Sequence, residues 1–187
     1  MATLTELVNM ALLECGAQPL DTDIDDATER ARAAKTAWPF VRKTILRLHP
    51  WNPPTKRALL DADATAPSWG FATRYPLPAD YIRMLDVDTD EQWRIEGAWL
   101  VTDATGDDLG VRYVYDETDP ADYDATLTDA MVLFMAFRIM HRLSGDKGMR
   151  DRISADWQNY LREAKRIDGL EQTAAELEDD TFITARY

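Results

Sequence analysis

The sequence predicts an α+β protein, mainly α, in which a four-helix bundle carries an inserted small antiparallel β-sheet subdomain and an extended C-terminal arm. Three observations support this fold class. Apolar residues recur at helical spacing in four segments, prolines and β-favouring residues dominate the middle, and the C-terminal segment lacks an amphipathic period. The predicted boundaries are 1–56 and 123–169 for the bundle, 57–122 for the β-rich subdomain and 170–187 for the arm.

The first predicted helix covers residues 3–15. Its apolar residues follow the spacing of one helical face: Leu4, Leu7, Val8, Ala11 and Leu12. Thr3 and Glu6 have the spacing of a capping box, in which side chain and backbone satisfy each other at the first turn. Gly16 is placed to end the helix because glycine readily adopts the left-handed conformation of a C-cap.

The second predicted helix is long and begins near Asp26 and Glu29, whose acidic side chains suit a helix N-terminus. An acidic run at residues 21–26 has the alternation of a calcium loop, but neither the required glycine nor the closing glutamate is present. Seven apolar residues form an unbroken heptad stripe: Ala27, Ala31, Ala34, Trp38, Val41, Ile45 and Leu48. Pro39 lies inside this pattern, which predicts a kink or a short break near Thr36 and Ala37.

Basic residues of the same helix fall outside the heptad stripe. We expect them on exposed faces, where they are candidates for contacts between subunits. The candidates are Arg30, Arg42, Lys43 and Arg47. A solvated helix face is the alternative explanation for these charges.

The stretch LRLHPWNPP, residues 46–54, follows this helix. Pro50 is expected to stop the helix, and Trp51 to lie pinned against the bundle, where its indole N–H would need a hydrogen-bond partner. Pro50, Trp51 and Asn52 are therefore predicted to anchor the inserted subdomain and to set its angle to the helices. Direct contact of Trp51 with a partner protein is the alternative.

Short β-strands are predicted after this stretch because proline is frequent and β-favouring residues appear. The predicted strands are Tyr81–Val87, Gln92–Glu96, Ala98–Thr102 and Gly110–Tyr115. Gly97 and residues 105–108 mark the turns between them. These segments predict one small antiparallel sheet.

Two more helices follow the strands. The first starts at a capping motif from Thr126 to Asp129 and is apolar nearly all round, which predicts a place at the centre of the bundle. The last helix has apolar residues at helical spacing and is expected to end at Gly169. These residues are Ile153, Trp157, Tyr160, Ala164 and Ile167. Residues 170–187 are predicted to be an arm that becomes ordered on a partner.

The charge of the chain is strongly segregated. The net charge is −13, and residues 86–124 hold thirteen acids against Arg94 and Arg112. Residues 29–57 hold eight bases against one acid. This acidity opposes binding to the phosphate backbone of nucleic acids, although an acidic wall would keep DNA from adhering inside a conduit.

Evidence for catalysis or a cofactor is weak. Cys15 and His141 could pair as nucleophile and base, but no third residue that would orient them can be named, and both residue types are common in cores. The clustered acids offer many chance pairs without the arrangement of a hydrolase site. The sequence has neither a Cys-x-x-Cys motif nor a histidine cluster to hold zinc, and phosphate-binding glycine motifs are absent, so we expect no cofactor or metal. The longest apolar run, Ala130–Phe137, is too short to cross a membrane, and the N-terminus lacks the features of a signal peptide.

Three phrases in this order resemble the head-to-tail adaptors of tailed bacteriophages, in particular the tail tubular protein A-like type. The first is Leu48-His49-Pro50-Trp51-Asn52 at the end of the long helix. The second is the stretch from Tyr75 to Arg83, and the third runs from Trp93 to Leu100 and is followed by Val111–Tyr115. Pro53 departs from the family pattern, in which an aromatic residue often follows the asparagine.

The resemblance covers nearly the whole chain and implies a structural protein without enzymatic activity. It implies a dodecameric ring beneath the portal protein, at the head-tail junction of a virion assembled in the host cytoplasm. The lumen would continue the channel for double-stranded DNA, and the β subdomain would face a tail tube, nozzle or tail-completion protein. The arm would reach the portal through Glu171, Glu178, Asp179, Phe182, Ile183 and Tyr187. The alternatives are a small hydrolase using Cys15 and His141 or the clustered acids, and a non-viral helical interaction module.

Overall fold

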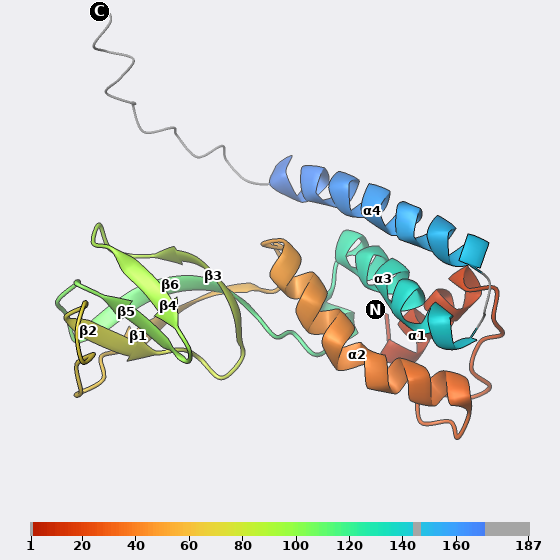
Figure 1. Ribbon diagram of the computed structural model, residues 1–187, viewed down its shortest axis with the longest axis horizontal. Helices are drawn as coiled ribbons and strands as arrows, with labels where there is room; N and C mark the ends of the chain where they lie inside the picture. Colours follow the sequence, from red (N-terminus) through yellow and green to blue (C-terminus); the bar gives the residue numbers. More distant parts are fainter. Residues whose placement is uncertain (1, 144–146, 171–187) are drawn as a thin grey trace, which may run out of the picture.

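The computed structural model describes residues 2–143 and 147–170. Within these residues it has four α-helices and two antiparallel sheets of three strands each (Figure 1). The helices are α1 (Leu4–Glu14), α2 (Glu29–Leu48), α3 (Ala125–Leu143) and α4 (Lys147–Leu170). The strands are β1 (Thr55–Asp61), β2 (Thr73–Pro76), β3 (Tyr81–Val87), β4 (Trp93–Glu96), β5 (Trp99–Thr102) and β6 (Asp108–Tyr115). The strands gather at one end of the molecule and the helices at the other (Figure 1).

Helix α1 has the predicted caps at both ends. The Thr3 hydroxyl accepts the backbone N–H of Glu6, and the Glu6 carboxylate accepts the backbone N–H of Thr3. Gly16 has φ +67°, and the N–H groups of Gly16 and Ala17 donate to the carbonyls of Leu13 and Leu12. This pattern is a Schellman motif, so the capping box and the glycine stop are confirmed.

Helix α2 begins later than predicted and is unbroken. Its N-cap is Thr28, whose side chain accepts the N–H of Ala31, whereas the Asp26 carboxylate accepts hydrogen bonds from Thr22. The predicted start near Asp26 is therefore wrong, because the aspartate closes the preceding turn instead. The predicted short break at Thr36 and Ala37 is also absent. Pro39 lies on the exposed side of the helix, where water can donate a hydrogen bond to the carbonyl that lacks a donor because proline has no N–H.

The heptad stripe of α2 is buried except at its ends. Its five central residues are buried: Ala31, Ala34, Trp38, Val41 and Ile45. Ala27 precedes the helix and is exposed, and Leu48 is 41% exposed where the helix stops. The stripe therefore packs inward over its middle turns only.

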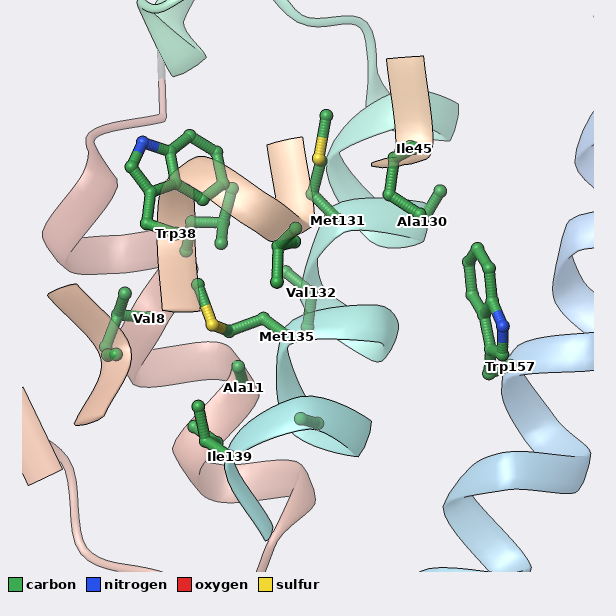
Figure 2. Packing of buried hydrophobic residues seen from close by; sticks show 14 of the residues in the cluster. Val8, Ala11, Trp38, Ile45, Ala130, Met131, Val132, Met135, Ile139 and Trp157 are labelled. Atoms are coloured by element: carbon green, nitrogen blue, oxygen red, sulfur yellow. The ribbon is translucent and has the colours of Figure 1, made fainter. Parts of the chain in front are cut away.

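Helix α3 packs against each of the other three helices, as its apolar composition predicts. Met131 and Met135 project from α3 towards Trp38 of α2, while Trp157 approaches from α4 on the other side (Figure 2). The N-terminus of α3 is capped by Asp124, whose carboxylate accepts the N–H of Leu127 at 2.6 Å. The predicted capping motif at Thr126 does not form this cap.

Helix α4 contacts the core through part of its predicted stripe. Ile153, Trp157 and Ala164 are buried, whereas Ile167 is 42% exposed. The helix continues past Gly169 to Leu170, where the described part of the chain stops, so the predicted stop at Gly169 is wrong. The predicted arm from residue 171 onward lies outside the described residues.

The strands form two sheets, β1-β6-β3 and β2-β5-β4, where the sequence predicts one. The four predicted strands are present as β3 to β6, and the β4–β5 turn contains Gly97 at φ +61°. Strands β1 and β2 were not predicted. The two sheets share a second hydrophobic cluster, which contains Leu60, Tyr75, Met84, Val87, Leu100, Leu109, Val111 and Tyr113.

Candidate functional site: the junction between helices and strands

The junction between α2 and β1 is formed by the stretch that the sequence singles out. His49 precedes Pro50 and is extended, with φ −145° and ψ 148°, because the proline ring disfavours the helical conformation in the residue before it. The helix therefore ends at Leu48, as predicted. Pro50 and Asn52 are partly buried on either side of Trp51.

Trp51 is fully buried and belongs to the hydrophobic cluster of the helices. Its indole Nε1–H donates to the carbonyl of Ile45 at 2.9 Å, and its ring makes an edge contact with His49 at 4.9 Å between centroids. The Ile45 carbonyl lies in the last turn of α2, where carbonyls lack intrahelical donors. The Trp51 side chain therefore both packs in the core and caps the C-terminus of α2. The predicted burial of Trp51 and the predicted hydrogen-bond partner of its indole N–H are confirmed.

The backbone after Trp51 turns directly into the sheet. The Thr55 hydroxyl donates to the Trp51 carbonyl at 2.7 Å, and the Thr55 N–H donates to the Asn52 carbonyl at 3.2 Å. The Pro54 carbonyl accepts the N–H of Tyr115 at 2.9 Å. Pro53 and Pro54 thus leave no amide donor unpaired at this turn, since proline has none.

Arg42 forms the main polar link between α2 and the segment that leaves β6. Its Nε and Nη2 donate to the two carboxylate oxygens of Asp116 at 2.7 and 3.0 Å. Only 12% of the Arg42 side chain and 17% of the Asp116 side chain are exposed, and the guanidinium also lies 5.8 Å from the Trp38 ring centroid. The hydrogen bonds that Arg42 donates to Asp116 raise the pKa of Arg42. The bidentate geometry fixes direction as well as distance.

Two further arginines connect α2 with β3. Arg47 donates from Nη1 to the Ile82 carbonyl at 2.6 Å, and Arg83 donates from Nη1 to the Arg47 carbonyl at 3.4 Å. Ile82 and Val114 of the strands also belong to the helical hydrophobic cluster. The junction therefore combines one tryptophan, two buried apolar strand residues and three arginines.

A second polar group lies beside the junction around Asp80. Lys56 and the hydroxyl of Tyr113 both bind the Asp80 carboxylate, the latter at 3.1 Å, and the Lys56 ammonium lies 4.5 Å from the Tyr115 ring centroid. The Asp80 bond raises the pKa of Lys56. Burial opposes ionisation of Asp80, but the bonds from Lys56 and Tyr113 outweigh it and lower the pKa of the carboxyl.

The four subunit-interface candidates have different surroundings. The expectation of an exposed position is wrong for Arg42. Its side chain is largely buried in the junction, where it pairs with Asp116. Arg47 is exposed but hydrogen-bonds Ile82, and Arg30 donates to the Gln18 carbonyl at 3.0 Å. Lys43 is 60% exposed and lies 3.8 Å from Asp116. The six arm residues predicted to bind the portal lie outside the described part of the chain.

The Cys15 thiol is unsuited to nucleophilic attack. It is 5% exposed, donates to the Ala136 carbonyl at 3.4 Å, and burial, together with the charge of Glu14, raises its pKa to about 11. Thiols react as thiolates, so this group is almost wholly protonated at neutral pH. His141 lies in α3, but its side chain is outside what the structure describes.

Three of the clustered acids have separate structural roles. Asp116 pairs with Arg42, Asp119 accepts the N–H of Ala121, and Asp124 caps α3. Among the described residues, no group of three or more His, Cys, Asp or Glu side chains is placed to hold a metal ion. Across the same residues, no helix is long and apolar enough to cross a membrane.

Two hollows lie on the outer faces of the sheets. An open groove of about 860 Å³ covers β1, β6 and β3, with Arg57 and Arg112 facing Asp86 and Asp88 around Gly110. A smaller pocket of about 290 Å³ lies between β2-β5-β4 and the loop that carries Trp69, whose side chain is 87% exposed. Neither hollow is predicted from the sequence, because one involves β1 and the other β2, and these strands lack a clear strand pattern. Trp69 and Phe71, two aromatic residues in a segment without a strand pattern, are the sequence signal for the smaller pocket.

No protein-family model matches the chain, and no curated protein matches its sequence.

Proposed function

We propose that this chain is a structural virion protein, a head-to-tail adaptor that joins the capsid of a tailed bacteriophage to its tail. In this proposal the four helices form a bundle from residues 1–56 and 123–169, and copies of it build a dodecameric ring beneath the portal. The strands of residues 57–122 project towards the next tail component, which is a tail tube, nozzle or tail-completion protein. The protein would act in the virion after assembly in the host cytoplasm.

The observation that carries the proposal is the position of Trp51. The phrase from Leu48 to Asn52 resembles the adaptor family, and in the structure it occupies the point where the long helix passes into the strands. A buried tryptophan that also caps the helix would hold the ring-forming and tail-facing parts at a fixed angle. An adaptor needs such a fixed angle because it bears on two different partners at once.

The acidity of the chain fits a DNA conduit. A net charge of −13 opposes adhesion of double-stranded DNA, so the duplex would slide through the lumen without sequence-specific binding. The helices that would surround the lumen need no cofactor for this role.

The C-terminal arm is proposed to bind the portal. Residues 171–187 include Glu171, Glu178, Asp179, Phe182, Ile183 and Tyr187, which combine acidic and apolar side chains. Ordering of this segment on the portal would make assembly sequential, because capture would follow portal formation. A hydrolase based on Cys15 is disfavoured by the raised pKa of that thiol.

Co-sedimentation with cognate portal rings tests the proposal. The full chain is expected to sediment with the portal, and a chain ending at Leu170 is expected to stay folded by circular dichroism but to remain in the supernatant. The matched control replaces residues 171–187 by a glycine and serine segment of equal length. Failure of the full chain to sediment would contradict the adaptor role, while capture of the truncated chain would contradict the role of the arm alone.

A further inference from the structure

Two helix faces outside the junction carry exposed apolar side chains. On α1, Met10 is 46% exposed and Leu13 is 60% exposed, with Glu6 and Glu14 exposed beside them. Their spacing places all four on one side of the helix, opposite the buried residues. We call this set the α1 face.

The second face lies on α2. Phe40 is 64% exposed and is flanked by the exposed residues Arg32, Thr36 and Lys43, all within one stripe along the helix. We call this set the α2 face. Aromatic residues, phenylalanine among them, are enriched at protein interfaces relative to the rest of the surface.

Helices α1 and α2 carry opposite charges, apart from Glu29 at the start of α2. Every ionisable side chain of α1 is acidic, namely Glu6 and Glu14. After Glu29, every ionisable side chain of α2 is basic: Arg30, Arg32, Lys35, Arg42, Lys43 and Arg47. The α1 face and the α2 face are therefore complementary in both respects, since each offers apolar residues and the charge that the other lacks.

We propose that the α1 face of one copy of this chain packs against the α2 face of the next copy. Because the two faces differ, the contact is head to tail, so its repetition does not stop at a pair. The proposed adaptor ring is the case in which the rotation from copy to copy closes. A second copy is the occupant that supplies both faces in equal number. This inference rests on the proposed adaptor ring and names the surfaces that build it.

Lys43 is the base best placed to bind across this contact. It is 60% exposed and lies 3.8 Å from Asp116, a longer separation than a direct charge-assisted hydrogen bond. Arg42 is held by Asp116 and Arg47 by the Ile82 carbonyl, so both are committed within the copy. On the opposite face, Glu14 ends α1 outside the Thr3 and Glu6 capping box.

Cysteine cross-linking tests the contact directly. We would prepare Met10→Cys and Phe40→Cys chains, singly and combined, and treat each at high protein concentration with a short bis-maleimide. Cys15 does not interfere, because it is buried and its pKa is about 11. The mixture of the two single variants should give a covalent dimer, and each single variant alone should give no covalent product. The double variant should give a ladder of larger covalent products.

The control pairs Met10→Cys with Leu59→Cys, because Leu59 is 71% exposed but lies on β1. That mixture should give no dimer. The proposal is overturned if the Met10→Cys and Phe40→Cys mixture gives none either, if a single variant links to itself, or if the double variant stops at a dimer. The last result would mean a closed pair in place of a ring.

A charge exchange tests the role of the ion pair. Glu14→Lys and Lys43→Glu should each reduce the cross-linking yield severalfold, and the chain carrying both should recover it, while Lys147→Glu on α4 should have no effect. Absence of recovery would remove this pair from the contact. Portal co-sedimentation separates the two proposals. Cross-linked ladders without portal capture would support the contact and contradict the adaptor role. Portal capture without ladders would support the adaptor role and contradict the contact.

Discussion

The helical and strand regions are stabilised in different ways. The helices share one large apolar cluster centred on α3, whereas the strands enclose a smaller cluster between two short sheets and are surrounded by Arg, Asp and Tyr pairs. Few side chains connect the two regions, chiefly Trp51, Ile82, Val114 and the arginines of the junction. The difference teaches that each region has its own core, while their relative orientation depends on a small set of contacts.

Removing the tryptophan should have the largest effect. Trp51→Ala is expected to lower the free energy of unfolding by about 3–5 kcal/mol, because it leaves a cavity and exposes the Ile45 carbonyl. Trp51→Phe should cost less, since it keeps most of the packing and loses the hydrogen bond. Urea denaturation followed by circular dichroism measures both, with Trp69→Ala as the control, expected within about 0.5 kcal/mol because that side chain is 87% exposed. Equal losses at Trp51 and Trp69 would show that the junction is not a structural anchor.

A core substitution in the strands tests whether the two cores are independent. Leu100 is fully buried in the strand cluster, so Leu100→Ala should cost about 2–5 kcal/mol locally. Amide hydrogen exchange is expected to speed up in β2, β4 and β5 while protection in α1 and α3 is retained. Equal acceleration in the helices would mean that the molecule has one cooperative core.

Breaking the Arg42 and Asp116 pair should have an intermediate effect. Arg42→Ala is expected to cost about 1.5–3 kcal/mol, because charge-assisted hydrogen bonds are lost and a largely buried carboxylate is left to Lys43 alone. A double-mutant cycle with Asp116→Ala isolates the pair energy. The exposed Arg152 and Asp156 pair provides the matched cycle and should give no more than about 0.5 kcal/mol. Equal coupling in the two cycles would contradict a special role for the junction.

The smallest expected effect concerns acid. The pKa of Asp80 is lowered by Lys56 and Tyr113, so its contribution is present at neutral pH and is lost as the pH falls from the ordinary value of 3.8 through the lower folded value. Asp80→Asn should therefore be less stable than the native chain at neutral pH, and the gap should close in acid. Denaturation midpoints between pH 7 and pH 3 measure this, with the exposed Asp90→Asn as control. A gap that is constant with pH would contradict the assignment.

The parts of the fold that sequence predicts are those with local causes. The capping box of α1, the heptad stripe of α2 and the strand Tyr81–Val87 depend on spacing within one segment. Strand β1 was missed because Thr55–Asp61 alternates poorly and contains three charged residues; its pairing with β6 comes from the other end of the insertion. Strand β2 was missed because it is short and ends in Pro76.

The junction could be predicted in part for the same reason. The prolines around Trp51 predict where the helix ends and the junction begins. A buried indole N–H requires a hydrogen-bond acceptor, so a partner for Trp51 is predicted as well. The Arg42 and Asp116 pair joins positions 74 residues apart, so no local pattern contains it. The same holds for Lys56 with Asp80, which are separated by 24 positions.

Imaging of the purified chain mixed with cognate portal rings tests the adaptor role most directly. Electron micrographs are expected to show a second ring stacked on one face of the portal, coaxial with its channel, with twelvefold averages that place the strands away from the portal. Bare portals beside unbound chains would contradict the account. A single copy bound at the portal rim, with no ring, would contradict it equally.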